Sequence, residues 1–167
     1  IILSFIFEIL IGSFLLMLPI ATKDFKGASF FDALFTATSS TCVTGLIVHD
    51  TATYWSGFGQ AVIITLIQIG GMGVVTIAVL ISTLSGKNIS LKERSTMQEA
   101  ISAHKVGGIV RLMGFIIKST IVFELVGALI MFPSFFKEFG LKGIWYSIFH
   151  SISAFCNAGF DLMGVEE

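Results

Sequence analysis

Long apolar runs alternate with short polar segments along the chain of 167 residues. The hydrocarbon core of a bilayer is roughly 30 Å thick and needs about 20 apolar residues of helix. Three runs reach that length, namely residues 1–22, 55–86 and 109–136. The first run carries one charged residue, the second carries none, and the third carries three. The pattern therefore predicts three membrane-spanning helices.

Two further uncharged runs, residues 33–49 and 143–160, are too short and too rich in polar side chains to span a bilayer. A helix over residues 31–42 would be only about 18 Å long, so it would enter the membrane and stop near its middle. Backbone at that depth is tolerated only where it is buried in protein or lines a water-filled cavity. We therefore predict an all-α membrane protein with two re-entrant hairpins that line a pore.

Composition and charge exclude several other classes of protein. Hydrophobic residues make up 54% of the chain and charged residues only 13%, with a mean hydropathy of +0.93, whereas soluble domains are about one-quarter charged. The formal net charge of −1 gives no basis for binding nucleic acid. The two cysteines, Cys42 and Cys156, are too few for a disulfide scaffold. The sequence contains no hydrolase or metalloprotease motif. We expect a multi-pass protein of the cell membrane that contacts the lipid bilayer and is not an enzyme.

The distribution of basic residues predicts the topology. Residues 87–111 contain five Lys or Arg, against two in residues 23–32 and two in residues 133–143. Because basic loops stay in the cytoplasm, both hairpins should enter from the outside. Capping-box spacing between Ser90 and Glu93 predicts a helix in this cytoplasmic segment. It is either a connector at the membrane surface or a docking site for a cytosolic subunit.

The sequence also repeats itself at an offset of 114 residues. The identical pairs are Leu15/Leu129, Met17/Met131, Pro19/Pro133, Lys23/Lys137, Phe25/Phe139, Phe35/Phe149, Ser39/Ser153, Cys42/Cys156 and Gly45/Gly159. Shared hydrophobicity does not explain matched Pro, Lys, Cys and Gly, so we predict a repeated unit of outer helix, re-entrant helix, extended turn and inner helix. Residues 1–86 would form the first unit, residues 87–108 a connector, and residues 109–167 a second unit without its inner helix. We expect the chain to be part of a longer protein.

This unit has the chemistry of a cation pore. A short helix that enters from outside points its carboxyl end, with about half a negative elementary charge, at the membrane centre. The turn after it must present successive carbonyls to the ion, which favours a residue without Cβ, and Gly45 and Gly159 stand at that place. Asp50 and Asp161 lie just beyond, where they would attract cations. His49 beside Asp50 either tunes ion entry or belongs to a solvated loop.

Three segments carry a family resemblance: residues 37–46 (ATSSTCVTGL), 68–73 (QIGGMG) and 153–160 (SAFCNAGF). Together they resemble the Trk/Ktr/HKT superfamily of potassium transporters, and most of all its Ktr membrane subunits. The resemblance implies four such units around one pore. It also implies that K⁺ is coordinated by filter carbonyls, which would come from Val43, Thr44, Gly45, Asn157, Ala158 and Gly159. Cys42 and Cys156 would lie at the inner foot of that filter.

The same resemblance implies partners and an ion. Family members form homodimers that rest on a cytosolic nucleotide-binding regulatory ring, in a bacterial cell membrane. Glycine at position 45, where some relatives have serine, favours potassium over sodium. The alternative is a sodium-permeable transporter, or one in which Na⁺ is a coupling or activating ion. In a third reading the hairpins only pack, and no ion passes.

The remaining polar and small residues have structural interpretations. The glycines between Gly57 and Gly73 lie in an uncharged run and predict close helix packing rather than a phosphate loop. Glu8 and Glu124 are costly in lipid and should pair with another helix, with Lys118 as a candidate partner of Glu124. His150 should be a packing histidine rather than the base of the neighbouring serine, since adjacent helical residues point about 100° apart.

Overall fold

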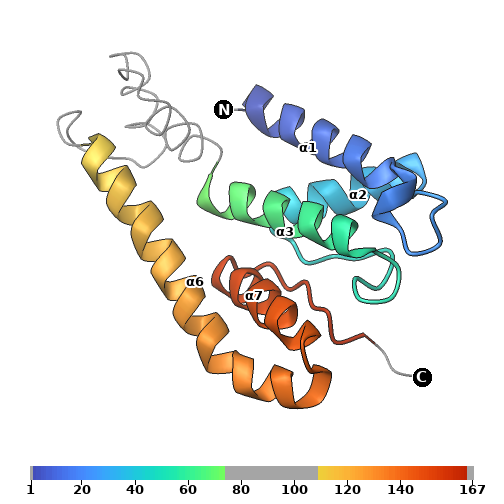
Figure 1. Ribbon diagram of the computed structural model, residues 1–167. Helices are drawn as coiled ribbons and strands as arrows, with labels where there is room; N and C mark the ends of the chain where they lie inside the picture. The colour runs from blue at the N-terminus through green and yellow to red at the C-terminus, as the bar shows by residue number, and fades with distance from the viewer. Residues whose placement is uncertain (1, 74–108, 165–167) are drawn as a thin grey trace.

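The computed structural model describes residues 2–73 and 109–164, and within these ranges the chain is helical, with no strand. Its α-helices are α1 (Ile2–Met17), α2 (Phe30–Thr41), α3 (Gly57–Met72), α6 (Ile109–Phe139) and α7 (Lys142–Phe155). Helices α1, α2 and α3 pack on one another, α6 packs along α7, and α7 also contacts α3 (Figure 1). The predicted cytoplasmic helix and the second half of the second predicted span lie outside the described residues.

Hydrogen bonds join the two ends of the connection between α1 and α3. Pro19 opens a single 3₁₀ turn, Pro19–Ala21, because its fixed φ and missing amide hydrogen suit the first position of such a turn. The chain returns to this turn before α3, where the Ser56 amide donates to the Ala21 carbonyl at 2.9 Å and the Ser56 hydroxyl donates to the Ile20 carbonyl at 2.5 Å. The buried Trp55 covers the junction. Residues 22–55 therefore form a closed loop that contains α2.

Helix α2 is the short helix that the sequence predicts over residues 31–42. Its N-cap is Ser29, whose hydroxyl accepts from the Asp32 amide at 3.2 Å, and its C-cap is Cys42. The buried face consists of small and hydroxyl side chains, which are Ala33, Thr36, Ala37, Ser39, Ser40 and Thr41. Helix α7 is its counterpart in the second predicted hairpin and ends at the C-cap Cys156. The short helix predicted over residues 31–42 is therefore confirmed with a shift of one residue at each end, and the second predicted run, residues 143–160, contains the short helix α7.

Helix α3 lies at the centre of the described structure. Its buried residues include Val62, Ile63, Leu66 and Ile67, which form the hydrophobic core together with side chains of α1, α2 and the loops. Gly12 of α1 brings the two helices close, because a Cβ built there would lie 2.6 Å from a methyl carbon of Leu66. Helix α3 therefore contacts three other α-helices, α1, α2 and α7.

Helix α6 is the one helix in the described ranges that is both long and apolar enough to cross a membrane, over Arg111–Phe139. Helices α1 and α3 are apolar but have 16 residues each, or about 24 Å. Pro133 lies inside α6, and the helix continues to Phe139, whereas the sequence predicts an end near residue 136. The two prolines matched by the repeat therefore differ in local structure. Ring contacts of Tyr146 in α7 with Phe135 and Phe139 bridge the end of α6 to α7.

Candidate ion-binding loops

The turn after α2, residues 42–46, has an unusual backbone. Val43 has φ of 55° and Gly45 has φ of 74°, so the backbone is in the left-handed region at two of the three residues 43–45. A β-branched residue rarely adopts this conformation, which costs roughly 1–2 kcal/mol. The turn is closed by hydrogen bonds from the Val43 amide to the Ser40 carbonyl at 3.2 Å and from the Thr44 amide to the Ser39 carbonyl at 2.9 Å. The end of α2 holds the chain in this conformation.

The turn after α7, residues 156–160, has the same conformation 114 positions later. Asn157 has φ of 56° and Gly159 has φ of 73°. The Asn157 amide donates to the Ala154 carbonyl at 3.0 Å, and the Ala158 amide donates to the Ser153 carbonyl at 2.7 Å. These bonds correspond one to one with those of the first turn. Asparagine tolerates the left-handed region better than valine, so this copy is under less strain.

A serine anchors the far end of each turn. The Ser39 hydroxyl donates to the Leu46 carbonyl at 2.7 Å, and the Ser153 hydroxyl donates to the Phe160 carbonyl at 2.6 Å. Each serine thus folds the residue after the glycine back onto its short helix. Sequence reasoning assigns no role to these serines, although the pair Ser39/Ser153 belongs to the repeat identities and could have identified them.

The two turns meet at their glycines. A Cβ built on Gly45 would lie 2.5 Å from the Ala158 carbonyl oxygen and 3.4 Å from the Gly159 Cα. A Cβ on Gly159 would lie 3.5 Å from the Gly45 Cα. Turns from two ends of the chain therefore bring backbone against backbone, and Gly45 is required both by its φ and by this contact.

Helix α3 contacts the inner side of both turns. A Cβ on Gly70 would overlap the Thr41 carbonyl at the end of α2, and a Cβ on Gly71 would lie 2.7 Å from the Sγ of Cys156 at the end of α7. Gly59 similarly lies against the Ala21 carbonyl. The packing role predicted for these glycines is confirmed at all three positions. Around Gly57 and Gly73 no described atom lies within 4 Å of a Cβ, so packing does not explain them.

His150 positions the second turn. Its Nδ1 lies 2.7 Å from the Tyr146 carbonyl, and its Nε2 lies 3.2 Å from the Leu162 amide, which donates to it. Because Nε2 accepts from the Leu162 amide, Nδ1 is the ring atom that can donate to the Tyr146 carbonyl. The neighbouring Ser151 donates to the Glu124 carbonyl instead, at 2.6 Å. The prediction of a packing histidine is confirmed, and the structure adds that it anchors the backbone beyond Gly159.

The predicted acidic residues of the outer mouth lie in local turns. The Asp50 carboxylate accepts from the amide and hydroxyl of Thr53 at 2.7 and 2.8 Å, and that of Asp161 accepts from the Met163 amide at 2.9 Å. A Cβ on Gly164 would lie 3.9 Å from the Asp50 carboxylate, so the segments that follow the two turns lie on the same side of the molecule.

His49 is bound rather than free. Its Nε2 lies 3.3 Å from the carboxylate of Asp32 in the first turn of α2, and its ring stacks on Tyr54 with centroids 4.0 Å apart. Hydrogen bonding by the Ser29 hydroxyl, and then by His49, lowers the pKa of Asp32. Sequence reasoning misses the link between His49 and Asp32, because the residues are 17 positions apart in a loop without periodicity.

The intramembrane carboxylates behave differently from one another. Glu124 does pair with another helix, but its partner is Gln68 of α3 at 2.8 Å, and Lys118 is exposed on α6. Lys118 is therefore wrong as the partner. The oxygens of Glu8 are buried without a hydrogen-bond partner in the part of the chain that the structure describes, contrary to the predicted pairing.

A long apolar helix, and two short helices whose matching turns meet at glycine, are features expected of a helical membrane protein. The chain belongs to the TrkH cation transport protein family, whose match extends over residues 2–165. This is a family of membrane transporters, not of enzymes, and the resemblance noted in the sequence is confirmed.

Individual relatives support this membership. The chain is 45% identical over 162 residues to the potassium/sodium uptake protein NtpJ of Enterococcus hirae, covering 96% of this chain and 36% of the relative. It is 49% identical over 160 residues to the Ktr system potassium uptake protein B of Bacillus subtilis, covering 95% and 36%. The protein of that name in Vibrio alginolyticus is 37% identical over 163 residues, covering 97% and 35%. The chain thus spans about a third of the length of these relatives.

Proposed function

We propose that the chain is part of the pore-forming subunit of a potassium uptake transporter, and that the turns 42–46 and 156–160 form part of its selectivity filter. The observation that carries this proposal is the contact of two turns of the same backbone conformation, from positions 114 apart, at Gly45 and Gly159. The two turns share two positions of positive φ and three hydrogen bonds, which unrelated loops have no reason to share.

The mechanism follows from the direction of the short helices. Both α2 and α7 end in the turns, so the partial negative charge of each carboxyl end lies beside them. A cation that has shed water is stabilised there by these helix ends and by the carbonyls that replace its hydration shell. The candidate K⁺ ligands are the backbone carbonyls of Val43, Thr44, Gly45, Asn157, Ala158 and Gly159. Asp50 and Asp161, on the outer side, would raise the local concentration of cations.

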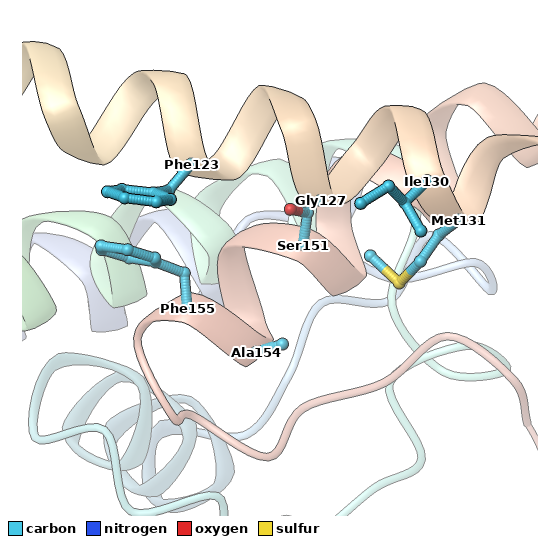
Figure 2. A pocket seen from close by; sticks show the side chains of 7 residues that line it. All are labelled: Phe123, Gly127, Ile130, Met131, Ser151, Ala154 and Phe155. Carbon is cyan, nitrogen blue, oxygen red and sulfur yellow. The ribbon is translucent and has the colours of Figure 1, made fainter.

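A groove between α6 and α7 supports the proposed repeat. It has a volume of about 480 Å³ and is lined by Phe123, Gly127, Ile130, Met131, Ser151, Ala154 and Phe155 (Figure 2). The residues 114 positions earlier belong to the surface where α1 and α2 meet α3. Ile130 is 73% exposed where its counterpart Leu16 is 0% exposed, and Phe155 is 46% exposed where Thr41 is 1% exposed. We infer that an inner helix from the remainder of the full-length protein covers this groove.

The choice of ion and partners rests on the resemblance and on the relatives. Relatives are named as potassium uptake proteins of the Ktr system and as a potassium/sodium uptake protein. We propose K⁺ as the transported ion, and a homodimer resting on a cytosolic nucleotide-binding ring as the assembly. Gly45 favours potassium, since a side chain there would meet the Ala158 carbonyl and change the filter. The second candidate, a sodium-permeable or Na⁺-coupled transporter, is favoured by the name of the Enterococcus relative alone.

The test is potassium-dependent growth of a transport-deficient bacterium that expresses the full-length parent protein. Wild type should restore growth at low K⁺, whereas Gly45→Ser and Gly159→Ser should lose uptake or shift it toward Na⁺. Gly140→Ser is the matched control, since Gly140 also has a positive φ of 60° but no described atom lies within 4 Å of a Cβ there. Filter variants that reach the membrane in wild-type amounts and take up K⁺ as well as the control would refute the proposal. Equal uptake of Na⁺ and K⁺ by wild type would favour the second candidate.

A further inference from the structure

Glu124 is the one acidic residue of the described part of α6 that lies deep in the helix, and it is only 9% exposed. Its carboxylate accepts a hydrogen bond of 2.8 Å from the side-chain amide of Gln68, on α3. A carboxylate inside a membrane span is costly and is kept where it has a specific partner. The bond joins the outer helix of the second unit to the central helix of the first.

Gln68 also contacts Cys156, the residue at the foot of the second turn. Because its amide nitrogen faces Glu124, its amide oxygen points the other way, and that oxygen lies 4.0 Å from the thiol of Cys156, which donates to it. Gly71, one helical turn further along α3, lets the backbone approach the same Sγ. Cys156 therefore sits in a niche of α3 formed by Gln68 and Gly71, and it is the last residue before Asn157.

Among the described residues, no side chain supports the first turn in this way. The position equivalent to Glu124 is Leu10, which is 51% exposed, and Cys42 is exposed in the described structure. At the end of α2, the Thr41 carbonyl lies against Gly70 of α3. Within residues 2–73 and 109–164, a bond from a carboxylate through an amide to the foot of a turn is therefore seen at the second turn and not at the first.

We propose that Glu124 and Gln68 are positioning residues that determine ion specificity by fixing the foot of the second filter turn. This inference rests on the proposed function. Glu124 accepts from the amide nitrogen of Gln68 and so prevents the amide from reversing, which keeps its oxygen available to the Cys156 thiol. When this orientation is lost, the Cys156 thiol loses its acceptor, and the backbone that carries the carbonyls of Asn157 and Ala158 loses an anchor on α3. The ion never touches either side chain.

The experiment measures the uptake of Rb⁺, as a substitute for K⁺, and of Na⁺ by cells that express the full-length protein. Glu124→Met should lower the ratio of Rb⁺ to Na⁺ uptake roughly tenfold, the size expected when a charge-assisted hydrogen bond is lost. Glu124→Gln keeps an acceptor for the Gln68 amide and should retain most of the ratio. Glu8→Met is the matched control, since Glu8 is a carboxylate on the other outer helix without a partner among the described residues.

Two further comparisons make the inference falsifiable. The double variant of Glu124→Met and Gln68→Met should be no worse than the worse single variant, because both remove the same path. If Glu124→Met does not reach the membrane, the ratio of Rb⁺ to Na⁺ uptake is measured for Gln68→Met instead. If that variant does not reach the membrane either, the same ratio is measured for Cys156→Ala.

The outcomes separate this inference from the function on which it rests. Gly159→Ser should alter the ratio whether or not Glu124 acts on the turn. If Gly159→Ser alters the ratio but Glu124→Met behaves as Glu8→Met does, the positioning role is wrong and the filter stands. If Gly159→Ser also leaves the ratio unchanged, the proposed function itself fails.

Discussion

Replacing Gly45 by alanine adds one carbon atom where two turns touch. The left-handed φ of 74° alone costs an alanine roughly 1–2 kcal/mol. The new Cβ would also lie 2.5 Å from the Ala158 carbonyl oxygen, well inside a normal contact, and that oxygen belongs to backbone that cannot rotate away. Overpacking of this kind typically costs about 1–3 kcal/mol. Gly45→Ala should therefore lose about 2–5 kcal/mol in total.

Gly140→Ala isolates the first of these two costs. Gly140 has φ of 60°, and no described atom lies within 4 Å of its Cβ position, so only the conformational cost of roughly 1–2 kcal/mol applies. The assay heats the purified full-length protein in detergent, at low and at high K⁺. It measures the temperature at which half of the protein is no longer monodisperse, and this temperature is taken as the unfolding midpoint. Gly45→Ala should unfold at a lower temperature than Gly140→Ala and should lose stabilisation by K⁺, since the turns must separate. Equal midpoints, with K⁺ stabilisation retained in both variants, would refute the contact of the turns.

Three more changes test single features. Val43→Asn should raise the unfolding free energy by about 1 kcal/mol, because asparagine tolerates the left-handed φ of 55°, and a lower unfolding midpoint would contradict the strain. Ser153→Ala removes the bond of 2.6 Å to the Phe160 carbonyl and should cost roughly 1 kcal/mol, together with a higher K⁺ concentration for half-maximal uptake. The pKa of Asp32 is lowered, chiefly by the Ser29 hydroxyl, so its contribution to stability is present above its ordinary pKa and is lost as pH falls through the lowered value. The midpoint difference between wild type and Asp32→Asn should accordingly shrink as the pH falls below about 4; a difference that persists unchanged to low pH would exclude Asp32.

Periodicity and composition were sufficient to predict the elements but not their contacts. The length of α2 follows from Ser29 as a cap and from a polar run too short to span, and both are local signals. The partner of Glu124 is not local. Lys118, two turns away on the same helix, is the partner that electrostatics suggests, but the carboxylate faces α3 and the lysine faces outward. Which face of a helix meets which neighbour depends on tertiary packing, which a single sequence does not encode in any short window.

Pro133 shows the same limit for helix ends. Proline commonly breaks a helix, and α1 ends two residues before Pro19. At Pro133 the helix continues because the aromatic side chains around it have partners: Phe132 contacts Phe136, and Phe135 stacks on His150 of α7 with centroids 4.9 Å apart. Packing between α6 and α7 therefore outweighs the loss of one backbone hydrogen bond.

The glycines of the turns show how a correct prediction can rest on an incomplete reason. The sequence requires glycine at positions 45 and 159 because the backbone must turn there, and the φ values agree. Yet Asn157 and Val43 adopt similar φ values without being glycine, so the dihedral angle alone does not demand one. What distinguishes Gly45 is the Ala158 carbonyl against its Cα, a contact between residues 113 positions apart. A substitution at Gly45 therefore reports on the meeting of the two turns, whereas one at Val43 reports on a single turn, and only the former should change which ion passes.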